Sequence, residues 1–205
     1  IKKIKKGNLI SLKGQKNLLA FNYNVGFDPS SAAFIIALTL LTPNSKSIIK
    51  NVVCNPTRIK YIEILKKMNA KIKIKNLRKD SNSGEFLGSI VTESSNLKPV
   101  SISKDVGMFI DELPILFVIA AMTRGTSKFK SISELAHKES SRAVEMKKIL
   151  EQVGIKCKNT KNSMTIYGKS KIKNKGKFIL VKTKGDHRIC MSSTILSLAT
   201  GIKSK

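Results

Sequence analysis

The same order of sequence patterns occurs twice along the chain, and a third copy begins near its end. An aspartate precedes a long apolar stretch at Asp28, Asp111 and Asp186. After each of the first two stretches come a short β-type run, an amphipathic segment and another β-type run. The first two copies are offset by about 83 or 84 residues and align almost without gaps, so we expect a repeated helix, strand, helix, strand unit. Because each unit must bury its apolar helix against its neighbours, the repeat favours a layered α/β fold.

Helix-start, turn and periodicity signals give the expected element boundaries. In the first copy, Asp28 is expected to cap a buried helix, with Pro29 at its first position and the apolar run Ala32 to Leu41 after it. The sequence further predicts β-runs at 4–7 and 8–12, strands at 47–52, 71–75, 128–132 and 155–157, alternating pieces at 88–92 and 100–102, and helices at 55–68, from 111, at 140–152 and at 189–199.

The charge of the chain bears on the class of its partner. Its 205 residues carry a formal net charge of +26, with 39 lysines and arginines against 13 acidic residues. Such charge often marks nucleic-acid binding, because cations release counterions from phosphate backbones. Here only five basic residues are arginine, the lysines are scattered, and aromatic residues make up 5%, whereas nucleic-acid surfaces combine arginine with aromatic side chains. We therefore expect no nucleic-acid partner and interpret the lysines as a solvated surface.

Cysteine usage and hydropathy indicate the compartment. Cys54, Cys157 and Cys190 are far apart and form no metal-binding spacing, which favours a reducing cytoplasm and no structural metal. The longest apolar run, 32–41, is too short to span a bilayer, so no membrane association is expected. The chain begins without methionine and stops soon after an apolar helix pattern, and we expect it to be a fragment.

A polar segment at 137–142 indicates where the chemistry lies. It carries Lys138, Glu139 and Arg142 at the expected start of a helix. A helix N-terminus already has a partial positive charge, so two cations are unfavourable there unless an anion lies between them. This local misfit predicts a site that binds a small anion.

Five motifs, in order and in register, carry a family resemblance: Gly26-Phe27-Asp28-Pro29-Ser30-Ser31-Ala32-Ala33-Phe34, Asn55-Pro56-Thr57-Arg58, Ile110-Asp111-Glu112-Leu113-Pro114, Lys138-Glu139-Ser140-Ser141-Arg142 and Gly185-Asp186-His187-Arg188. Together they resemble the 5-enolpyruvylshikimate-3-phosphate synthase family of the shikimate pathway. The resemblance covers essentially the whole chain, but only about the C-terminal half to two-thirds of the family's full chain.

The resemblance implies an inside-out α/β barrel of the enolpyruvyl transferase fold, with two domains of three repeats each and substrates in the cleft between them. Residues 1–22 would then be a remnant of the preceding domain or crossover, and 23–205 would be most of one domain. Its repeats would be 23–105, 106–184 and a truncated 185–205.

The implied reaction transfers the carboxyvinyl group of phosphoenolpyruvate to the 5-hydroxyl of shikimate 3-phosphate, with no metal or organic cofactor. By resemblance, Asp111 orients and deprotonates the 5-hydroxyl, and Glu139 protonates the methylene carbon of phosphoenolpyruvate. Lys138 contacts both substrates, and Arg142 and Arg188 bind phosphoenolpyruvate. Taken alone, Asp111 would be an ordinary N-cap and Glu139 a surface ion pair with Arg142.

Other residues of the motifs have simpler interpretations. Ser30 and Ser31 are expected to cap a helix, His187 to pack, and His137 to be incidental; Arg58 is the repeat counterpart of Arg142. The chain has Ala136-His137 and Ser141 where the family commonly has Arg-Val and Asp. These departures concern the geometry around the site and the affinity for substrates more than the type of reaction. The family's N-terminal lysine, the arginine and the serine and glutamine contacts of the other domain, and the C-terminal lysine lie outside the chain, so the fragment alone is expected to be inactive.

Three alternatives stay open. The related transferase that acts on UDP-N-acetylglucosamine shares the implied fold and chemistry. A basic nucleic-acid-binding domain would account for the charge. A degenerate, non-catalytic domain would keep affinity for anions and lack turnover. For the intact enzyme, the resemblance implies a cytoplasmic monomer.

Overall fold

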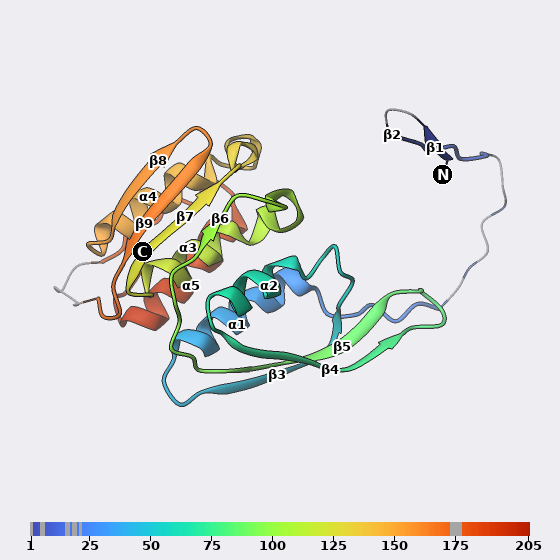
Figure 1. Cartoon of the computed structure of the whole chain (residues 1–205), viewed down its shortest axis with the longest axis horizontal. Coiled ribbons are helices and arrows are strands. Elements are labelled where there is room, and N and C mark those ends of the chain that lie inside the picture. The colour runs from blue at the N-terminus through green and yellow to red at the C-terminus, as the bar shows by residue number, and fades with distance from the viewer. Residues whose placement is uncertain (1, 5–6, 15–16, 18–19, 21, 173–177) are drawn as a thin grey trace.

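Three helices form the centre of the molecule. They are α1 (Pro29–Leu41), α3 (Leu113–Ala121) and α5 (His187–Thr200), and they pack against one another (Figure 1). The computed structural model describes residues 2–4, 7–14, 17, 20, 22–172 and 178–205. All nine residues of α3 are buried, because this helix is apolar on every side and neighbours surround it. Within the described ranges, no helix is long and apolar enough to cross a membrane.

The first sheet covers α1. It consists of β3 (Lys46–Val53), β5 (Phe86–Glu93) and β4 (Lys71–Lys79), in the order β3-β5-β4 with antiparallel neighbours. Helix α2 (Lys60–Lys67) lies between β3 and β4 in the chain and packs on β4. Phe27, just before α1, pairs in parallel with Val52 of β3.

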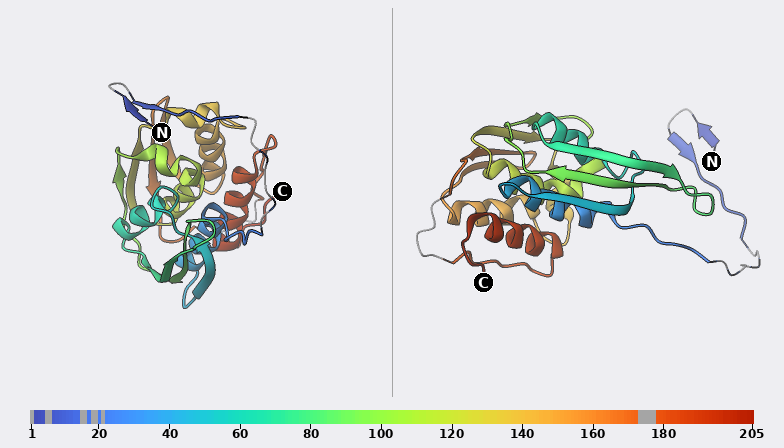
Figure 2. Two further views of the ribbon diagram at one scale, coloured as in Figure 1. Left: turned by 90° about the vertical axis from the view of Figure 1, so that its right-hand side faces the viewer. Right: turned by 90° about the horizontal axis from the view of Figure 1, so that it is seen from below.

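The second sheet repeats this arrangement against α3. Its order is β6-β7-β9-β8, with β6 (Ser101–Ile102) parallel to β7 (Gly125–Lys130), and with β9 (Ser163–Gly168) antiparallel to both β7 and β8 (Lys156–Thr160). Helix α4 (Arg142–Gln152) packs on β8 as α2 packs on β4. In Figure 1, α1 and α3 lie between the two sheets, whereas α4 lies beside β8 and β9; Figure 2 shows the same elements from two further sides.

The third copy begins in the same way. Ile179, upstream of α5, pairs in parallel with Ser204, downstream of it. Parallel pairing across an apolar helix therefore occurs at Phe27–Val52, at β6–β7 and at Ile179–Ser204. This shared topology is why the starts of α1, α3 and α5 lie close to one another.

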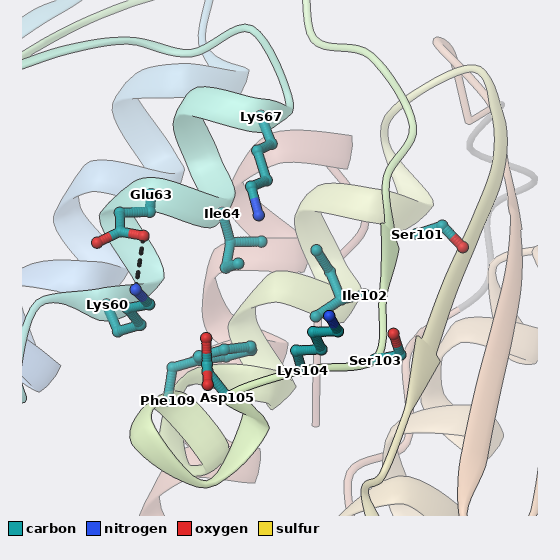
Figure 3. A pocket seen from close by; sticks show the side chains of 10 residues that line it. All are labelled: Lys60, Glu63, Ile64, Lys67, Ser101, Ile102, Ser103, Lys104, Asp105 and Phe109. Atoms are coloured by element: carbon teal, nitrogen blue, oxygen red, sulfur yellow. Dashed lines mark ion pairs between the residues drawn. The ribbon is translucent and has the colours of Figure 1, made fainter.

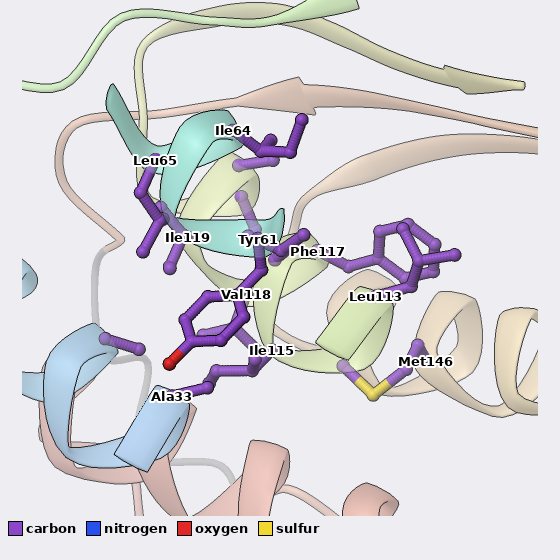
Figure 4. Packing of buried hydrophobic residues seen from close by; sticks show 14 of the residues in the cluster. Ala33, Tyr61, Ile64, Leu65, Leu113, Ile115, Phe117, Val118, Ile119 and Met146 are labelled. Atoms are coloured by element: carbon purple, nitrogen blue, oxygen red, sulfur yellow. The ribbon is translucent and has the colours of Figure 1, made fainter. Parts of the chain in front are cut away.

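Aromatic and aliphatic side chains fill the space between the helices (Figure 4). The rings of Phe117 and Phe129 meet edge to face at 5.1 Å between centroids. Tyr61 of α2 is buried, and its hydroxyl donates a hydrogen bond of 2.9 Å to the carbonyl of Pro29. This bond satisfies the only polar atom of the tyrosine side chain and fixes α2 to the start of α1.

The N-terminal strands form a separate hairpin. Strands β1 (Lys2–Ile4) and β2 (Gly7–Leu9) pair with each other, and all their residues are exposed. The hairpin lies away from the rest of the molecule (Figure 1). The predicted β-runs at 4–7 and 8–12 overlap these strands only in part, and Lys5 and Lys6 lie outside the described residues.

The structure corrects several predicted boundaries. Helix α2 begins at Lys60 rather than at 55, because Pro56 and Thr57 form a turn first. Helix α4 begins at Arg142 rather than at 140, and strand β9 was not predicted.

Asp111 is not an N-cap. Residues Val106–Glu112 form a 3₁₀ helix, η1, and α3 follows directly at Leu113 without any side-chain cap. A second 3₁₀ helix, η2, spans Ser133–His137 and leads towards α4. In contrast, Asp28 caps α1 as predicted, and Asp186 caps α5.

Candidate functional site

The carboxylate of Asp111 faces cations from two other segments. Its Oδ1 lies 3.1 Å from Nζ of Lys138 and 2.8 Å from Nη1 of Arg142. Its Oδ2 lies 4.0 Å from Nη2 of Arg188. Burial raises the pKa of Asp111, but the hydrogen bond from Lys138 and the charge of Arg188 outweigh burial and leave the pKa below its ordinary value. Asp111 is therefore a carboxylate at neutral pH.

Arg142 is the first residue of α4 and is only 1% exposed. Each of its three nitrogens donates to a different carboxylate: Nε to Asp186 at 2.9 Å, Nη1 to Asp111 at 2.8 Å, and Nη2 to Glu139. These three partners come from three segments far apart in sequence. The misfit of cations at a helix start is thus resolved, because carboxylates surround the guanidinium.

Asp186 caps α5 and also pairs with Arg142. It is 0% exposed, and its Oδ1 caps α5 by accepting from the backbone N–H of Arg188 at 3.0 Å. Its Oδ2 accepts from Nε of Arg142 and, at 2.8 Å, from the hydroxyl of Ser140. Burial opposes ionisation of Asp186, but these bonds outweigh it and leave its pKa lowered.

The substitution Asp186→Asn is expected to destabilise the protein in a pH-dependent manner. The folded-state pKa of Asp186 lies below the ordinary 3.8, so its ionised form stabilises the fold fully above about pH 5. This contribution is lost as the pH falls through the folded-state pKa. We expect a loss of about 3 kcal/mol at pH 7 that shrinks below pH 4, measured by urea unfolding of both proteins. A loss independent of pH would contradict this account.

Arg188 lies beside the same cluster, near the start of α5. Its side chain is 14% exposed. Nη1 donates a 3.1 Å hydrogen bond to the carbonyl of Asp111 and lies 3.6 Å from Oε1 of Glu112. The structure thus brings together all five residues that the motifs single out, namely Asp111, Lys138, Glu139, Arg142 and Arg188.

The sequence analysis did not predict that Glu112 and Ser140 form hydrogen bonds at the edge of this cluster. Ser140 donates to Asp186, and Glu112 accepts a 2.6 Å hydrogen bond from the hydroxyl of Ser30. Ser30 therefore has a carboxylate partner, whereas Ser31 donates to Asp28 in the expected capping interaction. A glutamate directly after Asp111 at the start of an apolar helix was the available signal.

A cavity of about 210 Å³ adjoins the cluster. Its lining includes Ser30, Arg58, Asp111, Glu112 and Arg188. Arg58, the repeat counterpart of Arg142, faces this cavity but stays 51% exposed, with a 2.9 Å ion pair to Asp28.

Another cavity, of about 230 Å³, lies between α2, β6 and η1 (Figure 3). Its lysines include Lys60, which pairs with Glu63 at 2.8 Å, and Lys67 and Lys104. None of the residues predicted for the site lines this cavity. Across the described part of the chain, no three His, Cys, Asp or Glu side chains gather as metal ligands would.

Comparison with known protein families shows to which family the chain belongs. The model of the family described as EPSP synthase (3-phosphoshikimate 1-carboxyvinyltransferase) matches residues 1–203. The chain belongs to the EPSP synthase family. Its relatives include the 3-phosphoshikimate 1-carboxyvinyltransferase of Caldicellulosiruptor saccharolyticus, which is 41% identical over 89% of this chain. The protein of the same name from Helicobacter pylori is 37% identical over 90% of this chain.

Solved structures agree with this assignment. The EPSP synthase from Acinetobacter baumannii matches 91% of the chain with a TM-score of 0.79 and 34% identity. The enolpyruvyl transferase NikO from Streptomyces tendae matches 86% of the chain with a TM-score of 0.56 and 14% identity, which speaks for the fold alone. The predicted α/β enolpyruvyl transferase fold is confirmed.

The chain is shorter than the relatives that it matches. It spans 41% of the Caldicellulosiruptor protein, 44% of the Helicobacter protein and 42% of the Acinetobacter structure. This share is smaller than the half to two-thirds that the resemblance suggested. Other members of the EPSP synthase family thus contain a comparable length of chain beyond the part that matches here.

Proposed function

We propose that the complete protein transfers the carboxyvinyl group of phosphoenolpyruvate to the 5-hydroxyl of shikimate 3-phosphate. A C–O bond forms between the 5-oxygen and C2 of phosphoenolpyruvate while a proton is added to its methylene carbon. Loss of a proton from the methyl group so formed, together with loss of phosphate from C2, then gives 5-enolpyruvylshikimate 3-phosphate. The observation that carries the proposal is the single network of Asp111, Lys138, Glu139, Arg142 and Arg188, in a chain of this family.

Asp111 would act on the acceptor hydroxyl. Its lowered pKa keeps Asp111 ionised at neutral pH, so the carboxylate could accept a hydrogen bond from the 5-hydroxyl and orient it. It would take the hydroxyl proton as the new C–O bond forms, when that proton becomes far more acidic. Lys138, 3.1 Å from Asp111, would contact both substrates and offset their negative charge.

Glu139 would supply the proton for the methylene carbon. It accepts a hydrogen bond from Nη2 of Arg142. A substrate carboxylate that bound the same edge of Arg142 would compete with Glu139 and release it towards the substrate. Arg142 and Arg188 would bind phosphoenolpyruvate, since guanidinium groups pair with carboxylate and phosphate through two parallel hydrogen bonds.

The remaining expectations follow from the same proposal. The division into 1–22, 23–105, 106–184 and 185–205 stays a prediction. The complete protein would be a cytoplasmic monomer that binds small anions, with neither nucleic acid nor membrane as a partner. The 205-residue chain alone would be inactive, because the cleft also needs contacts from the rest of the protein.

Phosphate release by the complete protein tests the proposal. We expect inorganic phosphate to appear only when phosphoenolpyruvate and shikimate 3-phosphate are both present, and a product with the mass of the enolpyruvyl ether to accumulate with it. Turnover with UDP-N-acetylglucosamine in place of shikimate 3-phosphate would overturn the substrate assignment. Binding of phosphoenolpyruvate without turnover would indicate a degenerate, non-catalytic protein.

A further inference from the structure

Glu112 is a buried carboxylate between two of the central helices. It lies at the junction of η1 and α3 and is 4% exposed. Its Oε1 accepts the 2.6 Å hydrogen bond from Ser30 of α1 and lies 3.6 Å from Nη1 of Arg188 of α5. One oxygen therefore links α1 and α5 through the start of α3.

Residues Asp111 and Glu112 make the contacts that hold the guanidinium of Arg188 in place. Nη1 donates to the carbonyl of Asp111 and faces the carboxylate of Glu112. Nη2 lies 4.0 Å from the carboxylate of Asp111. An arginine side chain has several rotatable bonds, so contacts with one nitrogen restrict the plane and direction of the whole group.

The cost of burial argues for a specific role of Glu112. A buried carboxylate is unfavourable unless hydrogen bonds and an opposite charge compensate it. Burial indeed raises the pKa of Glu112, whereas the hydrogen bond from Ser30 and the charge of Arg188 act in the opposite direction. Glutamine at this position would form the bond with Ser30 without that cost, so the charge is explained by Arg188 rather than by Ser30.

We propose that Glu112 is a positioning residue for Arg188, which it orients, with Ser30 as its support, towards the anionic group of phosphoenolpyruvate. This inference rests on the proposed function, which makes Arg188 a ligand of that substrate. Glu112 itself does not touch the reacting atoms. It acts by fixing one edge of the guanidinium, so that the other edge is ordered before the anion binds.

The first test is kinetic and uses the complete protein with Glu112→Gln. We expect the KM for phosphoenolpyruvate to rise about tenfold, with the KM for shikimate 3-phosphate and kcat changed by less than about threefold, because Arg188 would contact only the first substrate. Glu134→Gln removes one exposed carboxylate of η2 and is the matched control, with constants equal to those of the wild type.

Two kinetic results would overturn the proposal. A lower KM for phosphoenolpyruvate would mean that Glu112 only competes with the anion for Arg188. An equal rise of both KM values together with a lower melting temperature would mean that Glu112 has a purely structural role.

The second test does not depend on turnover. In protein with ¹⁵N-labelled arginine, the Nε–Hε resonance of Arg188 is identified by its loss in Arg188→Lys. We expect Glu112→Gln to shift this resonance and Glu134→Gln to leave it in place. If the wild type lacks turnover, the proposed function fails while this measurement still decides whether Glu112 positions Arg188. An unmoved resonance would overturn the positioning role.

A second variant covers the case in which Glu112→Gln does not fold. Ser30→Ala leaves the carboxylate in place and removes the hydrogen bond that supports it. We expect a smaller shift of the Arg188 resonance in the same direction and a rise of about threefold in the KM for phosphoenolpyruvate. No change in either quantity would count against the proposal.

Discussion

Replacing Glu139 with glutamine is expected to lower kcat of the complete protein by about 100-fold or more, because an amide cannot donate the proton that the methylene carbon requires. Glutamine can still accept the hydrogen bond from Arg142 through its carbonyl oxygen, so the geometry around the arginine should persist. Steady-state phosphate release with both substrates at saturation measures kcat directly.

Stability and a matched variant separate this effect from a general loss of structure. The side chain of Glu139 is half exposed, and Arg142 keeps its pairs with Asp111 and Asp186 in this variant, so we expect Glu139→Gln to unfold at nearly the wild-type urea concentration. Glu151→Gln removes an exposed carboxylate from α4 and should leave kcat unchanged. If Glu139→Gln also turns over at the wild-type rate, Glu139 is not the proton donor.

Replacing Arg142 with alanine is expected to lower the free energy of unfolding by about 3 to 5 kcal/mol, because it leaves a buried carboxylate without its cation. Asp186 is 0% exposed and would keep only its hydrogen bonds from Ser140 and from the start of α5. Urea unfolding at neutral pH measures the change. Arg142→Lys should be intermediate, since one ammonium cannot reach three carboxylates in separate directions.

Arg58 offers an internal control for this prediction. It occupies the equivalent position in the first repeat and pairs with Asp28 at 2.9 Å, but it is 51% exposed. An exposed pair of this kind contributes about 0 to 1 kcal/mol, so Arg58→Ala should have a small effect on unfolding. Equal losses in the two variants would contradict the view that burial makes the difference.

The architecture was predictable where the physical signal was strong. Helices α1 and α3 are apolar on nearly all sides, and α1 and α5 begin with an aspartate cap, so all three could be predicted from the sequence. Strand β9 was missed because only Met164 and Ile166 alternate inwards, between polar residues that resemble a loop. The start of α2 was placed too early because a proline marks either a helix start or a turn, and here Pro56 lies in a turn.

The predicted site depended on motifs more than on helix rules. The rule that aspartate caps helices assigned Asp111 wrongly, because a 3₁₀ turn runs directly into α3 and leaves the carboxylate free to face Lys138 and Arg142. The structure brings the five predicted side chains together, and their catalytic roles stay predictions. The contact of Glu112 with Arg188 joins residues that are far apart in sequence, so no local pattern could reveal it.

Asp186 contributes both to the stability of the fold and to the arrangement of the candidate site. The same carboxylate starts α5 and neutralises Arg142. A lineage that no longer needed the reaction could not discard this residue freely, since the loss would also weaken a central helix. An inactive descendant of this chain would therefore be expected to lose its exposed acid, Glu139, long before it lost Asp186.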